Sequence, residues 1–208
     1  MDAHIDESRS DILRKLFHER LKETTADAHQ ALEDTSISKA LVASDLNLST
    51  YKTYLKLMLD VNWDVEENIF PLVSDIIPDL DKRVKSKTII TDLEMLGESD
   101  IVPSVRPFTS DGKIITKPLA LGILYVTEGS TLGGRYILKN IQNALRLNKD
   151  YTAYFCGYGE QTGPQWKKFM EQLSAYAVDQ NCEDEIISGA VFAFNKTQEH
   201  FSNPGNYS

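Results

Sequence analysis

Apolar residues recur with the period of an α-helix along almost the whole chain, and this pattern constrains the fold more than any other feature. The helices that it predicts cover residues 11–34, 37–44, 49–70, 79–96, 118–147, 164–180 and 183–201. No segment alternates convincingly between apolar and polar residues, so strands are not expected. The sequence therefore predicts an all-α fold of about seven or eight helices, in a single domain over residues 1–208.

Local signals mark the expected ends of these helices. Ser49 is a candidate N-cap, Pro71 should stop the helix before it, and Gly97 should end the helix at residues 79–96. Pro118 suits the first position of the next helix. Residues 98–116 lose the periodicity and should form a long loop, while residues 1–10 and 202–208 should be flexible.

Composition excludes several classes of function. The chain has 208 residues and a formal net charge of −9, from 31 acidic and 22 basic residues. Such a charge disfavours nucleic acids and anionic membranes as partners. Two cysteines without metal-type spacing, no signal peptide and no long apolar run indicate a reduced, cytoplasmic protein.

Three glycines interrupt the long helix predicted at residues 118–147. They lie within Gly129-Ser130-Thr131-Leu132-Gly133-Gly134, and at helical positions they should cost about 2–3 kcal/mol relative to alanines. Such glycines allow close approach of the backbone to a flat or bulky group, or they allow the helix to bend. On this segment alone, tight packing between helices is the simpler explanation.

The first helix carries a lysine and a histidine on one face. Lys22 and His29 are seven residues apart, so they point the same way, about 10.5 Å apart along the axis. This spacing suits a ligand with a metal at its centre and a carboxylate at its rim, because a neutral imidazole can bind iron. A hydrogen-bonded histidine and a solvated lysine are the simpler interpretations of each residue alone.

The two segments together resemble the haem oxygenases. Residues 21–29 resemble the proximal helix of that family, and residues 129–134 resemble its kinked distal helix. Residues 124–128 are similar to those of bacterial members that supply biliverdin. Three further stretches agree in the same order, so the resemblance spans about residues 12–201: Tyr51 to Phe70, Trp166-Lys167-Lys168-Phe169 and Phe192-Ala193-Phe194-Asn195.

The resemblance implies a role for each matching residue. His29 would be the proximal iron ligand, and Lys22 and Lys167 would meet the haem propionates, with Tyr125 nearby. The distal residues that would lie against the porphyrin and steer dioxygen are Gly129, Ser130, Gly133 and Gly134. Haem would be both substrate and cofactor, opened to biliverdin with dioxygen and electrons, with release of carbon monoxide and ferrous iron.

The chain departs from the family pattern at three positions. Ser130 replaces an aspartate of the eukaryotic branch, and a serine hydroxyl can join a hydrogen-bond network but carries no charge. Glu171 stands where an arginine on the propionate side is familiar. Leu124 takes the place of a tyrosine associated with the propionates, and Tyr125 is adjacent to it. A haem carrier or sensor of the same fold, without turnover, therefore stays open as an alternative.

Two other helical enzymes fit less well. A di-iron protein needs Glu-x-x-His motifs, and no glutamate stands three residues before any of the histidines, which are His4, His18, His29 and His200. A thiamin-hydrolysing enzyme needs a cysteine nucleophile, and Cys156 has no evident activating base.

The electron donor implied by the resemblance would be a ferredoxin, a flavodoxin or a reductase. Because such donors are typically acidic, basic clusters are candidate docking sites. One cluster consists of Lys82, Arg83, Lys85 and Lys87, and the other of Lys167 and Lys168.

Overall fold

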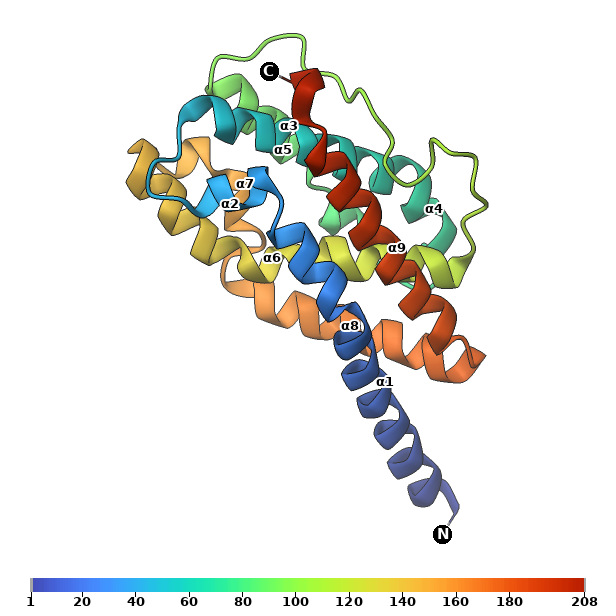
Figure 1. Cartoon of the computed structure of the whole chain (residues 1–208). Helices are drawn as coiled ribbons and strands as arrows, with labels where there is room; N and C mark the ends of the chain where they lie inside the picture. The colour runs from blue at the N-terminus through green and yellow to red at the C-terminus, as the bar shows by residue number, and fades with distance from the viewer. Residues whose placement is uncertain (1, 208) are drawn as a thin grey trace.

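The computed structural model describes residues 2–207, with side chains described for residues 9–205 and 207. Within this range the chain forms nine α-helical segments and no strand, which confirms the predicted all-α class (Figure 1). The segments are α1 (Asp2–Glu33), α2 (Ser36–Val42), α3 (Leu48–Asp64), α4 (Phe70–Val73), α5 (Ser86–Met95), α6 (Lys117–Leu145), α7 (Ala153–Cys156), α8 (Thr162–Gln180) and α9 (Glu183–Ser202). Five short π or 3-10 turns join them: η1 (Val65–Ile69), η2 (Leu80–Arg83), η3 (Lys149–Tyr151), η4 (Gly159–Gln161) and η5 (Pro204–Tyr207).

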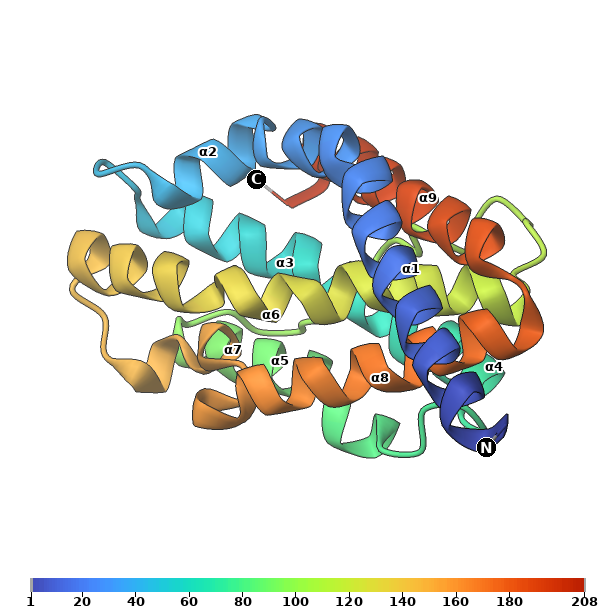
Figure 2. The same ribbon diagram turned by 90° about the horizontal axis from the view of Figure 1, so that it is seen from below.

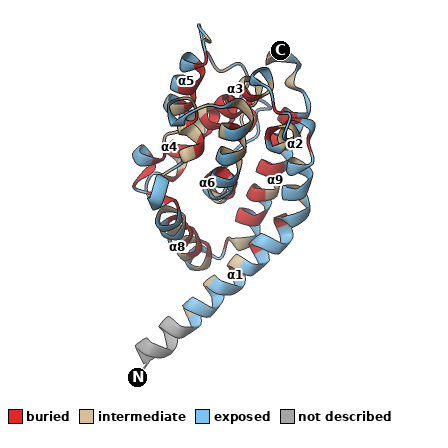
Figure 3. Cartoon of the chain, turned by 90° about the vertical axis from the view of Figure 1, so that its left-hand side faces the viewer, coloured by how far each residue is buried: buried red, intermediate tan, exposed pale blue. Residues whose placement is uncertain are grey.

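Helix α6 lies at the centre of the molecule, with α3, α8 and α9 around it (Figure 3). Its closest neighbour is α9, and two glycines bring the two backbones together. A Cβ atom on Gly122 would lie 2.2 Å from the carbonyl oxygen of Ile186, and one on Gly189 would lie 2.5 Å from that of Leu119. Neither position has room for a side chain, so this pair sets the distance between α6 and α9.

The segment between residues 47 and 73 differs from the sequence prediction at both ends. Asn47, not Ser49, caps α3, and its side-chain oxygen accepts a hydrogen bond from the Thr50 amide at 3.0 Å. Pro71 does not stop the helical path, because the π turn η1 places it in the first turn of α4. A proline is tolerated there because the first turn of a helix needs no intrahelical N–H donor.

The helix predicted at residues 79–96 is divided into η2 and α5. Glu66 explains the division, since its carboxylate accepts hydrogen bonds from the backbone amides of Lys85 and Ser86 at 2.7 and 2.9 Å. A capping group from a distant part of the chain thus starts a new helix at Ser86. The loop at 98–116 and the end of α5 before Gly97 are as predicted, and Gly97 has φ +84°.

Both ends of the chain contain more helix than the sequence predicts. α1 begins at Asp2 and extends beyond the rest of the molecule, where Ile12, Leu13 and Leu16 are exposed; burial in the core starts with Phe17 (Figure 1). At the other end, Tyr207 in η5 shares a hydrogen bond with Ser104 at 2.7 Å. Residues 1 and 208, which fall in the segments expected to be flexible, lie outside the described range.

None of the helices within residues 2–207 has both the length and the apolar character needed to cross a membrane.

Candidate functional site

Helices α1 and α6 meet at Thr25 and Tyr125. The Thr25 side chain lies close enough to the Tyr125 phenol to act on its pKa, and Thr25 Oγ1 donates to the carbonyl of Leu21 at 2.8 Å. Burial raises the pKa of Tyr125, and Thr25 partly offsets this rise. The two helices cross near this contact and then diverge (Figure 2).

One face of α6 is uncovered beyond this contact. α6 next meets α2 at Asn140, whose amide donates to the carbonyls of Leu41 and Ala43 at 3.0 and 3.1 Å. About 22 Å of helix separates the two contacts. Helical spacing puts four residues between them on the same face: Gly129, Leu132, Gly133 and Tyr136. Leu132 is 47% exposed and Tyr136 is 76% exposed, so the rest of the chain does not cover this face.

His29 lies one turn beyond Thr25, on the face of α1 that turns toward α6. Its side chain is 57% exposed, its ring centre lies 5.3 Å from that of Phe194 on α9, and its Nε2 lies 3.3 Å from Glu33 Oε1. The imidazole is therefore held on one side by an aromatic ring and is open on the other. A ligand that approaches Nε2 has only the exposed Glu33 carboxylate to displace.

The three glycines of the 129–134 segment of α6 have different neighbours. A Cβ atom on Gly133 would meet no atom within 4 Å, and one on Gly129 would lie 3.5 Å from the Trp166 ring, an ordinary contact. A Cβ atom on Gly134 would lie 3.0 Å from the Phe155 carbonyl oxygen. Close packing against α7 therefore accounts for a glycine at this position, whereas the sequence predicted that Gly134 faces the porphyrin. Packing within the chain does not explain Gly129 and Gly133.

The uncovered face fits a haem group. A flat ligand between α1 and α6 would use the space that Gly129 and Gly133 leave open, with His29 as an accessible imidazole on the other side. α6 stays α-helical from Lys117 to Leu145, without a break at the glycines, and the kink stays a prediction.

Ser130 contacts the interior behind this face. Its hydroxyl donates to the Thr127 carbonyl at 2.8 Å, and its side chain lines a small cavity together with Tyr154. Burial raises the pKa of Tyr154 well above its ordinary value, so its phenol stays protonated at neutral pH. The adjoining cavity has a volume of about 30 Å³, and it can hold about one water molecule but no porphyrin.

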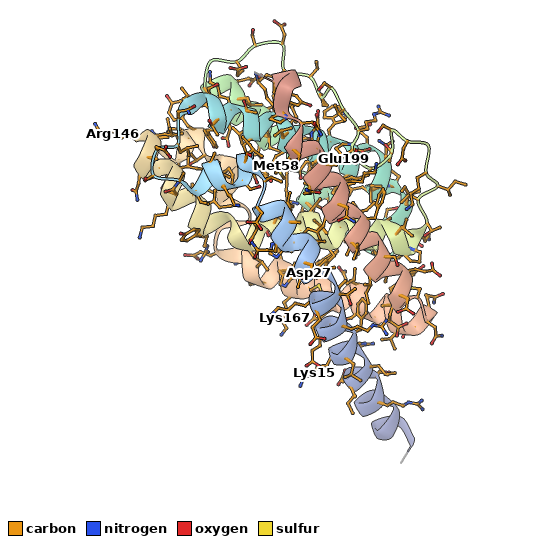
Figure 4. All side chains as sticks on the ribbon, in the orientation of Figure 1. Lys15, Asp27, Met58, Arg146, Lys167 and Glu199 are labelled. Atoms are coloured by element: carbon orange, nitrogen blue, oxygen red, sulfur yellow. The ribbon has the colours of Figure 1, made fainter. Side chains whose placement is uncertain are left out.

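The two lysines expected to meet carboxylates are both exposed. Among the described side chains, no carboxylate lies within 4 Å of the Lys22 amine, whereas Lys167 Nζ lies 3.8 Å from Glu171 Oε1. Figure 4 places Lys167 on α8 beside α1, between the levels of Lys15 and Asp27, next to the stretch that carries Lys22. Glu171, the unexpected acid, thus lowers the positive charge near Lys167.

A buried charge cluster, which the sequence analysis missed, lies directly before Gly129. The Glu128 carboxylate, 2% exposed, accepts hydrogen bonds from Arg83 Nη1 at 2.5 Å, from Lys85 Nζ, and from the Tyr158 hydroxyl at 2.9 Å. Two members of the basic cluster predicted at residues 82–87, Arg83 and Lys85, are therefore occupied inside the protein, which leaves Lys82 and Lys87 exposed. Lys168 is likewise paired with Asp79 at 2.8 Å.

The other helical enzymes find no support in the described residues. Within them, no group of three or more histidine, cysteine, aspartate or glutamate side chains could hold a metal ion. Burial raises the pKa of Cys156, and its thiol donates to the Thr152 carbonyl at 3.6 Å. A nucleophilic cysteine needs the opposite shift, toward the thiolate.

Known proteins of one family match the chain over nearly its whole length. A family model described as "Heme oxygenase" matches residues 15–203. The haem oxygenase PigA of Pseudomonas aeruginosa is 28% identical over 202 residues, which cover 94% of this chain and 95% of that protein.

Solved structures show the same fold. The haem oxygenase of Neisseria meningitidis, determined with NO and CO bound, is 24% identical with a TM-score of 0.71, covering 92% of this chain and 93% of that one. The haem oxygenase-1 of the cyanobacterium Synechocystis, in complex with haem, is 19% identical with a TM-score of 0.72 and the same coverage. The sequence match over residues 15–203 establishes the family, and the chain belongs to the haem oxygenases.

Proposed function

We propose that this protein opens haem to biliverdin, using dioxygen and electrons and releasing carbon monoxide and ferrous iron. The observation that carries the proposal is the uncovered glycine face of α6 opposite an accessible histidine. Among the described residues nothing lies within 4 Å of a Cβ on Gly133, a Cβ on Gly129 would have only the Trp166 ring at ordinary contact distance, and His29 is open on the side away from Phe194.

Each residue of the site has a distinct task in this proposal. Bound haem would supply the oxygen chemistry. His29 Nε2 would hold the iron as a neutral imidazole, after giving up its contact with Glu33. The backbone at Gly129 and Gly133 would lie against the opposite face of the ring and leave room there for dioxygen. Lys22 and Lys167 would fix the propionates through charge-assisted hydrogen bonds.

Ser130 and Tyr154 would donate hydrogen bonds near the distal face. Both side chains line the one-water cavity, and Ser130 is one of the groups that act on the pKa of the Tyr154 phenol. Because the Tyr154 phenol stays protonated at neutral pH, it can donate a hydrogen bond without adding charge. This pair would take the place of the aspartate that the family resemblance leads one to expect at residue 130.

Electrons would come from a partner protein. The chain has both cysteines free, and we infer a reduced cytoplasmic setting in which a ferredoxin, a flavodoxin or a reductase delivers them. The C-terminal half of α6 is a suitable docking surface. Residues 129–149 contain Arg135, Lys139, Arg146 and Lys149 but no acidic residue, although the chain carries 31 acids.

Reductive turnover tests the proposal against a haem carrier or sensor of the same fold. Glu171 beside Lys167 and the neutral Ser130 favour that second function, because both remove charge expected at the site. The protein is loaded with haemin, and an electron donor is added in air. Loss of the Soret band with the appearance of a biliverdin spectrum supports the enzyme, whereas a Soret band that persists through repeated reduction supports the carrier.

A further inference from the structure

Arg83 connects three elements of the structure from inside the protein. Its side chain is 1% exposed, and it is the largest of the fully buried side chains. Nη1 donates to Glu128 on α6, while Nη2 donates to the backbone carbonyl and the side-chain oxygen of Gln165 on α8, each at 3.4 Å. The same guanidinium also donates to Asp79, just before η2. The planar guanidinium has enough donors for all these partners, which a lysine lacks.

Arg83 joins two residues that directly precede Gly129 of the proposed haem site and Trp166, whose ring lies next to Gly129. Glu128 is followed by Gly129 and Gln165 by Trp166, and the Trp166 ring lies 3.5 Å from the Cβ position of Gly129. The ring centre of Trp166 is also 5.6 Å from that of Tyr125, where α6 meets α1. The place where α6 and α8 come together at the site is therefore directly beside the ion pair of Arg83 and Glu128.

Further contacts hold Glu128 in place. Lys85, directly before α5, and Tyr158, on the stretch that leads into α8, both donate to its carboxylate, and Lys168 binds Asp79. Burial opposes ionisation of Glu128, yet the attraction of Lys85 and Arg83 outweighs it, and the pKa of Glu128 lies below its ordinary value. The carboxylate is charged and has several donors around it, as a buried ion needs.

We propose that Arg83 and Glu128 are positioning residues of the haem site, which fix Gly129 on α6 against Trp166 on α8. This proposal rests on the proposed function, because the site that the pair positions is the proposed haem site. The contact between Gly129 and Trp166 that the pair would fix is present without haem. A role in stability alone would predict that breaking the pair weakens folding and leaves the wall formed by Gly129 and Trp166 unchanged.

Tryptophan fluorescence of the haem-free protein reports this wall directly. The chain has two tryptophans, so a Trp63→Phe background leaves Trp166 as the single reporter. In this background, Glu128→Gln removes the charge and keeps the shape, and Arg83→Lys keeps the charge and loses the bridge. Asp60→Asn is the matched control, because Asp60 is 1% exposed and holds Ser104 on another part of the fold.

We expect both test variants to shift Trp166 emission to longer wavelength and to increase its quenching by acrylamide. Asp60→Asn should lower the midpoint of thermal unfolding without either change. In a haemin titration, the test variants should bind about tenfold more weakly than the background, or about 1.4 kcal/mol.

Unchanged Trp166 emission and quenching in folded Glu128→Gln and Arg83→Lys would overturn the proposal. If Glu128→Gln does not fold, Arg83→Lys decides the question alone. The fluorescence comparison needs no haem, so it judges the pair separately from the proposed turnover.

Discussion

At the scale of single residues, glycines in the same helix serve different purposes. Gly122 is required by the backbone of α9, Gly134 by a carbonyl of α7, and Gly133 by nothing in the chain within 4 Å. The sequence shows only that these glycines lower the helix propensity of α6. Which of them packs and which faces open space depends on partners far away in the chain, and only the folded structure shows this.

Substituting two of these glycines by alanine separates the roles. Gly133→Ala should keep or raise the stability of the haem-free protein, because alanine favours a helix by about 1 kcal/mol and its methyl group meets no atom. The same variant should slow the conversion of haem to biliverdin, since the methyl group takes up space at the distal face. Thermal unfolding and the rate of Soret loss are the two measurements.

Gly122→Ala is the matched control. Its Cβ atom would lie 2.2 Å from the Ile186 carbonyl oxygen, so this variant should lose stability by a backbone clash. A Gly133→Ala protein that unfolds early and yet turns over haem at the normal rate would contradict the assigned role of Gly133.

At the scale of helices, local sequence signals predicted most elements. They failed where the end of a helix depends on groups that are distant in the sequence. Periodicity located the long helices, and the loop at residues 98–116 is where the pattern is lost. The break between η2 and α5 depends on the Glu66 carboxylate, and the passage through Pro71 depends on a π turn. Neither has a signal in the neighbouring residues.

The site shows the same division. The sequence could propose His29, Gly129 and Gly133 because their spacing on two helices and the family resemblance carry the information, and their roles stay predictions. The ion pair of Arg83 and Glu128 could not, because the partners are 45 residues apart. The only signal was a glutamate among apolar residues in the middle of a buried helix, and the structure shows that Arg83 and Lys85, which looked like surface charges, are its partners.

Acid should weaken the connection between these helices. The folded-state pKa of Glu128 lies below its ordinary value of 4.5, so the stabilisation from its ion pairs is complete above pH 4.5 and is lost as the pH falls through the folded-state pKa. The midpoint of thermal unfolding should therefore fall more steeply below pH 4.5 in the wild type than in Glu128→Gln. If the unfolding midpoints of the two proteins change with pH in parallel, the ion pairs of Glu128 do not contribute to stability.

At the scale of the whole molecule, charge is distributed unevenly. The net charge is −9, yet residues 129–149 carry four bases and no acid: Arg135 and Lys139 on α6, whose uncovered face belongs to the proposed site, and Arg146 and Lys149 just after it. A cationic strip on an acidic protein would attract an acidic electron donor and leave the remaining surface repulsive to it.

Charge reversal on this strip tests the docking surface. Lys139→Glu should slow turnover supported by an acidic ferredoxin or flavodoxin, and the difference from wild type should shrink as salt screens the attraction. Haem affinity should not change. Lys87→Glu makes the same change of charge in the basic cluster at residues 82–87 and should slow turnover less. Equal slowing by both variants would mean that overall charge matters and the strip does not.

Replacing His29 tests the central claim most directly. Wild-type protein and His29→Ala are mixed with haemin, their absorption spectra are compared, and an electron donor is then added in air. We predict that only the wild type shows the spectrum of imidazole-ligated haem and forms biliverdin, and that added imidazole partly restores the spectrum of His29→Ala. A His29→Ala protein with an unchanged spectrum and normal formation of biliverdin would contradict the account, because another residue would then hold the iron.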